Sequence, residues 1–556
     1  MLRTSHAALA LIATTIPVAH AQQLPSAGTQ LQQLPAAPEP ARPDADIDIH
    51  QPDAVAIDPD AGTAITVETL GVTGQTLYSE AELRAVSGFV PGNAFTFGQL
   101  RQLAAAITTY YRDRGYFLAQ AYLPEQDVQG GTVTIAVAEG RYGKLNVRNS
   151  SRLSNAVPSA ILEGLAPGDL VANAPLERRL LLLSDLPGIR VRGTLAPGAA
   201  VGTSDLIVDI TPGRTISGSV DADNGGSRYT GVYRVGGAVH LNNPAGIGDQ
   251  LSVRLLASDS GLGYGRIAYQ APVGLATLGI AFAHLRYDLG REFGALDGSG
   301  TANIASIYSS YPLMRSRRAN LYALASFDYK WLKDEIGLIS SRSDKRVQAA
   351  TLGLAGDFRD DMAGGGSSSF SLGWTSGHLD IKSPADRVND AATARSAGRY
   401  NKVQGSLARL QSVAGPLSLY GTVRGQWAFD NLDSSEKLDL GGADGIRAYP
   451  EGEAFGDSGY IAAIEARLQI NAAGEDLPGR FELAAFVDTG EIRYAQNPWF
   501  AGSNRAVRSG YGVGLNWYGP DGLGVRASYA RKLGTGPATS APDRGGRVWF
   551  QLVKLF

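Results

Sequence analysis

The stretch LYALASFDYKW, residues 321–331, alternates apolar and polar side chains with a period of two. Successive side chains of an extended strand point to opposite faces, so one face is wholly apolar and the other carries Ser326, Asp328 and Lys330. The segment IAAIEARLQI, residues 461–470, repeats this pattern. The combination is typical of a membrane β-barrel with a water-filled lumen, because lipid accepts neither charged side chains nor unpaired backbone groups.

The period of two continues from residue 214 to residue 556. A tilted membrane strand takes about 10 residues plus its connections, which predicts an even count of about 16 antiparallel strands and leaves 14 or 18 open. The chain ends on GRVWFQLVKLF, and the aromatic Phe556 is the terminal barrel signal that outer-membrane barrels commonly carry. A soluble β-sandwich would show a similar apolar face, but usually with shorter strands. We therefore expect residues 214–556 to form a transmembrane β-barrel.

Composition narrows the possible functions. The chain has 556 residues, a net charge of -3 and no cysteine. It lacks the basic excess with which proteins grip nucleic acid, so no nucleic-acid partner is expected. Without thiols it has no cysteine-ligated zinc, and we expect neither a metal nor another cofactor.

The N-terminus predicts export. Residues 1–21 combine Arg3, an apolar run and a small-residue cleavage site, as in a removable signal peptide. The apolar run is too short for a membrane anchor. Residues 22–62 carry seven prolines and almost no aromatic side chains, which predicts a Pro-rich linker.

A unit of strand, helix, helix, strand and strand occurs twice between the linker and the barrel. In residues 63–140, a strand that begins at Ile65 precedes one helix capped by Ser79 and a second helix capped by Thr96. Residues 141–213 repeat this order. The sequence therefore predicts two small α+β domains in tandem.

Enzymatic chemistry is not predicted. The sequence GDSG at residues 456–459 also occurs around the nucleophile of trypsin-like serine proteases, but four letters rich in glycine are a weak signal, and the histidines beyond the signal peptide lie in no protease context. In a barrel, Ser458 simply begins the strand after a loop. The motif GxxxxGK[ST] does not occur, so we expect no nucleotide hydrolysis.

The loop GGADGIRAYPEGEAFGD, residues 441–457, mixes glycines and a proline with Arg447, two aromatic residues and several acids. With this loop and three further stretches, the chain resembles the two-partner secretion transporters, the hemolysin secretion/activation family (TpsB). These stretches are RDRGYFLAQAYLPEQDVQGGTVTI (112–135), DNGGSRYTGVYRVGGAVHLNNPAGIGDQLSV (223–253) and AAFVDTG (484–490). The likeness covers nearly all of the mature chain. It implies a bacterial outer-membrane barrel preceded by two periplasmic POTRA domains.

The resemblance assigns a role to the loop. In the family, the sixth extracellular loop folds back into the lumen and carries a V-R-G-Y/F motif at its tip. Here the motif reads Ile446, Arg447, Ala448 and Tyr449. Because Ala448 replaces the family's glycine, the backbone at that position cannot freely take a positive φ.

A second family motif, F-x-D-x-G, lies on a strand of the barrel wall. Here it comprises Phe486, Asp488 and Gly490, and the alternation of the strand points Asp488 into the lumen. The contact that the resemblance implies is an ion pair between Arg447 and Asp488. This pair would pin the loop to the wall.

The implied function is secretion of one large β-helical partner protein, which the POTRA domains recognise in the periplasm and which crosses the barrel unfolded. An unfolded chain can add a strand to an exposed sheet edge. The expected binding surface follows the helix Phe97–Arg114 and four nearby residues, Tyr122, Leu123, Pro124 and Gln126. A helix also plugs the barrel in this family, and its equivalent would lie within Ser26–Leu34.

Other partners are expected to be the lipid of the outer membrane and, during biogenesis, periplasmic chaperones and the barrel-assembly machinery. Two other functions stay open. An outer-membrane assembly factor (barrel insertase) of the same superfamily usually carries more POTRA copies. A passive porin or receptor would need neither the two modules nor the Arg447 loop.

Overall fold

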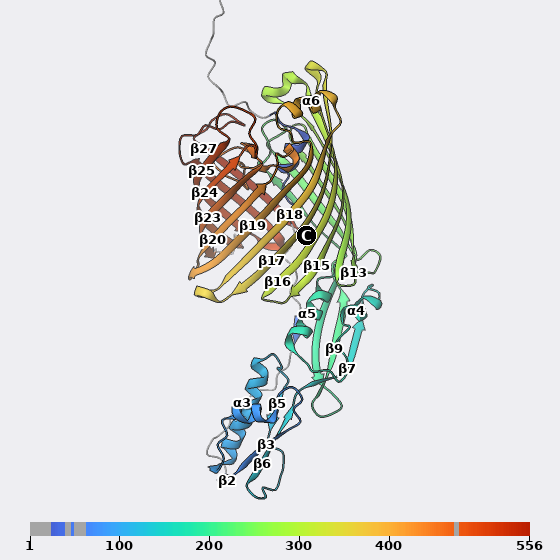
Figure 1. The fold of residues 1–556 in the computed structure, drawn as a ribbon, viewed down its shortest axis with the longest axis vertical. Helices are drawn as coiled ribbons and strands as arrows, with labels where there is room; N and C mark the ends of the chain where they lie inside the picture. The colour runs from blue at the N-terminus through green and yellow to red at the C-terminus, as the bar shows by residue number, and fades with distance from the viewer. Residues whose placement is uncertain (1–23, 39–45, 49–62, 472–477) are drawn as a thin grey trace, which may run out of the picture.

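The molecule is a barrel that continues at one end into two small modules in tandem (Figure 1). The computed structural model describes residues 24–38, 46–48, 63–471 and 478–556. The predicted signal peptide at 1–21 lies outside the described residues. Within the described ranges, no helix is both long enough and apolar enough to cross a membrane.

Sixteen antiparallel strands close into the barrel, which confirms the predicted fold class. The closing pair joins β10 to β27, from Ser219 opposite Leu555 to Asp223 opposite Gln551. The strands are β10 (Ile216–Asp223), β11 (Arg234–Asn242), β12 (Gln250–Ser258), β13 (Leu262–Val273), β14 (Ala276–Asp288), β15 (Gly298–Arg315), β16 (Ala319–Ile336), β17 (Ser341–Asp360), β18 (Gly366–Ile381), β19 (Gly398–Ala414), β20 (Leu417–Ala428), β23 (Ser458–Asn471), β24 (Arg480–Arg493), β25 (Arg505–Tyr518), β26 (Leu523–Lys532) and β27 (Gly546–Leu555). Short helices lie in the connections: η1 (Arg291–Leu296), η2 (Gly337–Ile339), η3 (Met362–Gly364), α6 (Pro384–Ala392) and η5 (Pro520–Gly522).

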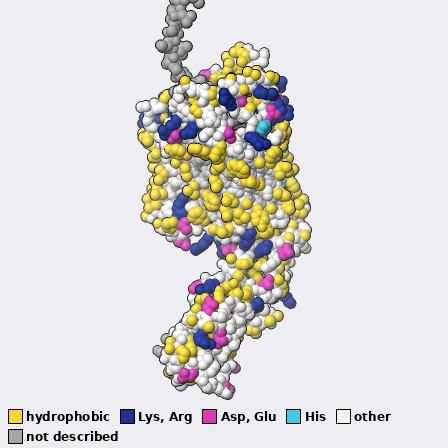
Figure 2. Space-filling view, viewed as in Figure 1, with side chains coloured by type: hydrophobic (Ala, Val, Ile, Leu, Met, Phe, Trp, Pro, Cys, Tyr) yellow, Lys and Arg dark blue, Asp and Glu magenta, His cyan; other side chains and the backbone are white. Residues whose placement is uncertain are grey.

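The side chains of each barrel strand alternate between lipid and lumen. On β16, Phe327 lies opposite Ile307 of β15, and both side chains are exposed on the outer surface. Apolar side chains form a band around the barrel, and most charged side chains gather above and below that band (Figure 2). Lys330, on the other face of β16, turns inward to Glu436. The two faces read from LYALASFDYKW are therefore the lipid face and the lumen face.

The first module, residues 63–140, is a small α+β domain. Its elements are β2 (Ile65–Val67), β3 (Thr69–Thr73), α2 (Glu80–Ser87), β4 (Asn93–Phe95), α3 (Phe97–Asp113), β5 (Gln120–Tyr122) and β6 (Thr132–Ala138). The sheet has the order β3-β6-β5. Thr96 and Gln99 form the expected capping box at the start of α3. The buried faces of both helices pack on the sheet through Leu83 and Ile107.

The second module, residues 141–213, repeats this plan with β7 (Arg141–Asn149), α4 (Ala156–Ile161), α5 (Asn173–Ser184), β8 (Ile189–Pro197) and β9 (Thr203–Pro212). It contacts the barrel directly. Arg315, at the end of β15, binds Asp185 with 2.8 Å between the charged atoms, and Arg178 of α5 donates to the carbonyl of Leu313. The module is thereby held at the periplasmic end of the barrel.

Within its described residues, the predicted linker at 22–62 contains a helix and a strand. The helix α1 (Ala27–Gln32) lies in the barrel lumen, and Ala27 belongs to a buried cluster lined by the inward side chains of the barrel strands. The strand β1 (Asp46–Asp48) pairs in parallel with β8 of the second module. The composition of this segment is therefore compatible with local packing against the rest of the chain.

Candidate functional site

The segment between β20 and β23 folds back into the barrel. It contains η4 (Ser434–Glu436) and the short strands β21 (Leu438–Asp439) and β22 (Phe455–Gly456), which pair with each other at the base of the loop. Within residues 441–457, the backbone takes a positive φ only at Gly442 and Gly452. These two glycines let the chain turn sharply, and the tip of the loop is buried.

Arg447 at the tip is held by the barrel wall. Its Nε and Nη2 donate to the two carboxylate oxygens of Asp488 at 3.0 and 2.7 Å, and its backbone N–H donates to Asp488 at 3.1 Å. Its Nη1 lies 2.8 Å from Glu465, and the guanidinium carbon lies 3.3 Å from the ring centre of Phe486. Trp549 donates to the carbonyl of Arg447 at 2.7 Å. The structure thus brings together the two residues that the sequence motifs suggested.

Burial decides how strongly this contact holds. Asp488 is 0% exposed and Arg447 is 15% exposed. A bidentate pair out of water needs good geometry to offset desolvation, whereas removal of one partner typically costs 3–5 kcal/mol. Loss of Arg447 would leave the carboxylate of Asp488 buried without its main donor. The contact therefore fixes the position of the loop.

The third motif residue on the wall, Gly490, makes room for the loop. A Cβ atom at this position would lie 2.8 Å from Cδ1 of Leu440 and 3.3 Å from Cδ1 of Ile446. Both contacts are shorter than ordinary van der Waals distances. Ile446, Leu440 and Phe486 belong to one buried apolar cluster, so the glycine allows the apolar side of the loop to pack directly on β24.

Ala448 is accommodated without a positive φ, because the left-handed turns fall at the two glycines already named. Its side chain is fully buried against β25. A Cβ atom at Gly510 would lie 2.5 Å from Cβ of Ala448. The absence of a side chain at Gly510 therefore provides the space that the extra methyl group of Ala448 occupies.

Tyr449 connects the tip to the last extracellular connection, residues 533–545. Its hydroxyl donates to the carbonyl of Gly536 at 3.0 Å. The neighbouring Glu453 accepts from Arg508 at 2.9 Å and from the backbone N–H of Thr539 at 2.8 Å. The tip is consequently bound by the wall on one side and by a second loop on the other.

The start of the loop has an anchor that sequence reasoning missed. Lys330 and Lys402 lie 2.6 and 2.9 Å from Glu436, and Lys345 lies 2.8 Å from Asp433. Burial raises the pKa of Glu436, but the two lysine charges outweigh it and lower this pKa to about 2. The anchor brings together residues that are far apart in sequence. Only the inward position of Lys330 gave any advance signal.

The lumen helix α1 rests on this anchor and on the wall. The Ser26 hydroxyl lies 3.0 Å from the Ser434 hydroxyl, and the Ala27 N–H donates to Asp334 at 2.7 Å. A Cβ atom at Gly28 would lie 2.6 Å from the backbone nitrogen of Ser435. The helix and the loop therefore share one contact surface inside the barrel.

The predicted binding residues of the first module differ in availability. Tyr122 is exposed, and Leu123 and Pro124 are half-buried. Gln126 is engaged, because its side-chain amide exchanges two hydrogen bonds of 2.7 Å with the backbone of Thr134 on β6. On β5, the N–H of Ala121 donates to Thr108 of α3. The edge next to these residues is thus partly closed by the module's own side chains.

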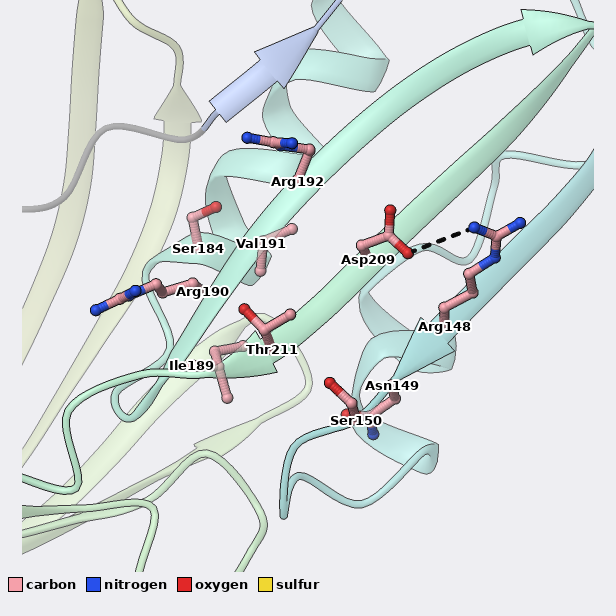
Figure 3. Close-up of a pocket in the computed structure, with 10 residues that line it drawn as sticks. All are labelled: Arg148, Asn149, Ser150, Ser184, Ile189, Arg190, Val191, Arg192, Asp209 and Thr211. Atoms are coloured by element: carbon pink, nitrogen blue, oxygen red, sulfur yellow. Dashed lines mark ion pairs between the residues drawn. The ribbon is translucent and has the colours of Figure 1, made fainter.

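The second module has a hollow of about 870 Å³ on its sheet (Figure 3). Arg190 and Arg192 project from β8, and Arg148 of β7 forms an ion pair of 4.0 Å with Asp209 of β9. The register places Arg192 opposite Asp46 of β1. The hollow is basic on balance and lies beside the edge that β1 occupies.

The GDSG sequence takes part in packing at the base of the loop. No group of three or more His, Cys, Asp or Glu side chains in the described ranges of the chain is placed to hold a metal ion. Ser458, within the GDSG sequence, begins β23, and its hydroxyl accepts from the N–H of Ala428 at 3.0 Å. Asp457 is fully buried and binds Lys437 at 2.5 Å. Both residues therefore stabilise the base of the loop.

Comparison with known proteins agrees with this architecture. The model of the haemolysin secretion/activation protein family ShlB/FhaC/HecB matches residues 202–517, and that of the ShlB-type POTRA domain matches residues 65–140. The heme/hemopexin transporter protein HuxB of Haemophilus influenzae is 26% identical over 88% of this chain and 86% of its own length. The outer membrane transporter CdiB of Dickeya dadantii is 22% identical over 78% of this chain and 77% of its own. The structure of CdiB from Escherichia coli has a TM-score of 0.70 and 19% identity, covering 91% of this chain and 93% of that one.

Proposed function

Because the chain belongs to the haemolysin secretion/activation family of outer-membrane transporters, we propose that it exports one large secreted protein, which it recognises in the periplasm and passes through its barrel unfolded. HuxB carries the name of a heme/hemopexin transporter. For this chain we propose as partner a secreted protein that needs its own outer-membrane pore. Export is not driven by nucleotide hydrolysis. Folding of the partner outside the cell makes export unidirectional.

The observation that carries this proposal is how the pore is closed. The lumen is filled by α1 and by the loop of residues 429–457, which are both segments of the chain that are held to the wall by hydrogen bonds and ion pairs. Both can leave the lumen without breaking a strand of the barrel. The charged lumen wall also has no continuous apolar surface to which the extended partner chain would bind. A closed pore with removable contents is suited to the passage of a polypeptide.

Recognition is proposed to begin on the first module. Phe97 and Tyr122 are 53% and 41% exposed, so they offer aromatic surface near the start of α3 and at the end of β5. Because Gln126 already closes part of the sheet edge, these aromatic side chains are better candidates for first contact than the edge itself. The β8 edge of the second module, which already accepts β1, is a candidate for strand addition.

The test is export of the co-encoded secreted protein in a strain that lacks the chromosomal copy and carries variants of this chain. We expect Phe97→Ala with Tyr122→Ala to reduce export at least tenfold at equal amounts of folded barrel. Val90→Ala is the matched control, because Val90 is 53% exposed on the same module. Equal export by the double variant and the control would reject this recognition surface.

The barrel-insertase alternative makes a different prediction in the same strain. If the chain assembled membrane proteins, its deletion would lower the amounts of other outer-membrane barrels and leave the co-encoded protein exported. A porin would instead change the uptake of small solutes. Loss of export with normal amounts of other barrels is the result expected here.

A further inference from the structure

Four basic side chains form a continuous group on the outer surface of β16–β19, near the extracellular ends of these strands. We call this group the basic rim; it consists of Lys333, Arg346, His378 and Arg399. The register makes them neighbours. Lys333 and Arg346 lie on adjacent strands and are diagonal neighbours on the same face, and so are Arg346 and His378. His378 lies directly opposite Arg399. Diagonal neighbours on a sheet are about 7–8 Å apart, so the four residues present one surface.

The outward direction of the rim follows from the alternation of each strand. Lys333 shares the face of Phe327, Tyr329 and Trp331, whereas Lys330 on the other face turns inward. His378 shares the face of the exposed Trp374. The rim therefore lies on the lipid-facing side of the barrel and not in the lumen.

Aromatic side chains fix the height of the rim. Tyr329 and Trp331 lie next to each other on β16, with ring centres 4.4 Å apart, and Trp374 of β18 is 49% exposed. Tyr and Trp gather where the acyl chains of a membrane meet its head groups. Lys333 follows Trp331 by two residues, about 7 Å further along the strand. The rim thus stands at the level of the head groups of the outer leaflet.

The lysine and the two arginines of the rim lack partners among the residues that the structure describes. Lys333, Arg346 and Arg399 form no ion pair or side-chain hydrogen bond with any residue in the described part of the chain. The Nε of Arg346 is buried and has no acceptor. Two carboxylates share this face, Asp344 opposite Lys333 and Asp380 opposite Arg346, but Asp380 pairs with Lys382 and neither forms an ion pair with the rim.

The other side of the barrel is different. The outward positions of β10–β13, all within the described residues, carry no lysine or arginine and are filled by small and aliphatic side chains such as Val235 and Leu255. In Figure 2, Lys and Arg side chains lie above the apolar band, and those at the right stand beside one His. The strands β10–β13 therefore differ from β16–β19 in having no outward lysine or arginine.

We propose that the basic rim binds the phosphate groups of the glycolipid in the outer leaflet, lipopolysaccharide. Its lipid A phosphates lie at the boundary between acyl chains and sugars, which is the level that the aromatic residues mark. Phosphate oxygens supply the acceptors that Lys333, Arg346 and Arg399 lack, and guanidinium groups bind phosphate in a bidentate way. This binding site is independent of the secreted partner. It orients the β16–β19 side of the barrel toward ordered lipid.

The test measures binding of lipopolysaccharide to the full-length protein in detergent, by native mass spectrometry and by titration. The variant Lys333→Gln/Arg346→Gln/Arg399→Gln removes three positive charges. Each basic residue at a membrane surface contributes about fivefold to binding, so we expect affinity to fall about 100-fold. The control Arg318→Gln/Arg480→Gln/Lys554→Gln removes the same number of charges at the periplasmic ends of the strands, and its affinity is expected to stay within about twofold.

Two further arms identify the ligand. Lipid A without its phosphates should bind the wild-type protein as weakly as lipopolysaccharide binds the triple variant, and the variant Lys333→Arg/Arg399→Lys, which keeps the charges, should keep most of the affinity. Equal affinities of the triple variant and its control would overturn the proposal. Phosphatidylglycerol vesicles that bind as tightly as lipopolysaccharide would also overturn it, because the rim would then be a general anion surface. Heat-modifiable migration in gels confirms that each variant has a folded barrel.

Discussion

Removal of the Arg447 side chain should release the loop from the barrel wall. Arg447→Ala leaves Asp488, which is 0% exposed, without the two guanidinium donors at 2.7 and 3.0 Å. Removal of one partner of a buried pair costs about 3–5 kcal/mol, so the docking equilibrium should shift by roughly a hundred- to several-thousand-fold. Asp488→Ala should weaken the docking free energy by less, about 2–3 kcal/mol, because Arg447 keeps its ion pair with Glu465 at 2.8 Å.

The absence of cysteine from the chain gives a clean assay. Ala454, 7% exposed within the loop, is replaced by Cys, and its reaction with a membrane-impermeant maleimide is followed on whole cells. When the loop closes faster than the reagent reacts, the labelling rate is proportional to the fraction of undocked loop. Current through planar bilayers measures the same opening independently.

The double variant decides whether the two residues act as one contact. Once Asp488 is Ala, removal of Arg447 should add little, which gives a coupling free energy of about 2 kcal/mol or more. Additive effects would refute the contact as the determinant of loop position. The exchanged pair, Arg447→Asp with Asp488→Arg, should fail to restore docking because the new carboxylate would face Glu465. If the exchanged pair restored docking, repulsion between Glu465 and the new carboxylate would be too weak to decide the position of the loop.

Three other perturbations test the packing and the charges around this site. Gly490→Ala places a methyl group 2.8 Å from the loop and should raise the labelling rate about tenfold, since overpacking costs about 1–3 kcal/mol; an unchanged rate would contradict the close approach. Gly28→Ala drives a Cβ atom against Ser435 and should increase the bilayer current by displacing α1 without loss of the folded barrel. Burial raises the pKa of the Asp439 carboxyl to about 7, and burial together with the adjacent Asp439 raises the pKa of Glu451. Because the docked loop keeps a proton that the released loop loses near pH 4, docking should weaken as pH rises from about 4 through 7, and Asp439→Asn should reduce this trend in the current.

Several features could be read from local sequence because they depend on periodicity. The alternation around Phe327 and Lys330 gave the two faces of β16, and the capping residue Thr96 gave the start of α3. The chain length gave an estimate of about 16 strands, which left 14 or 18 open. These are consequences of backbone geometry, which makes neighbours at fixed spacing share a face whatever the rest of the chain does.

The candidate site could be predicted only in part from local sequence. Alternation placed Asp488 inward, but its pairing with Arg447 came from resemblance to a family and not from spacing. The exchange of two hydrogen bonds between Gln126 and Thr134 was not foreseen, and it engages the side chain of one of the predicted binding residues. The expected roles of Tyr122 and its neighbours in binding a partner stay predictions.

The sequence by itself determined that this chain forms a barrel with a wet interior and two small modules before it, because hydrophobic period and turn residues act over a few positions. That a loop and a helix fill the barrel was expected from the family resemblance, whereas the contacts that hold them there were decided by the tertiary structure. Glu436 meets Lys330 and Lys402 from different strands, and Ala448 fits because Gly510 lies opposite. Such pairs depend on which strands close the lumen and at what register. Their spacing in the sequence carries no trace of the contact, so only the folded chain reveals why the loop turns inward.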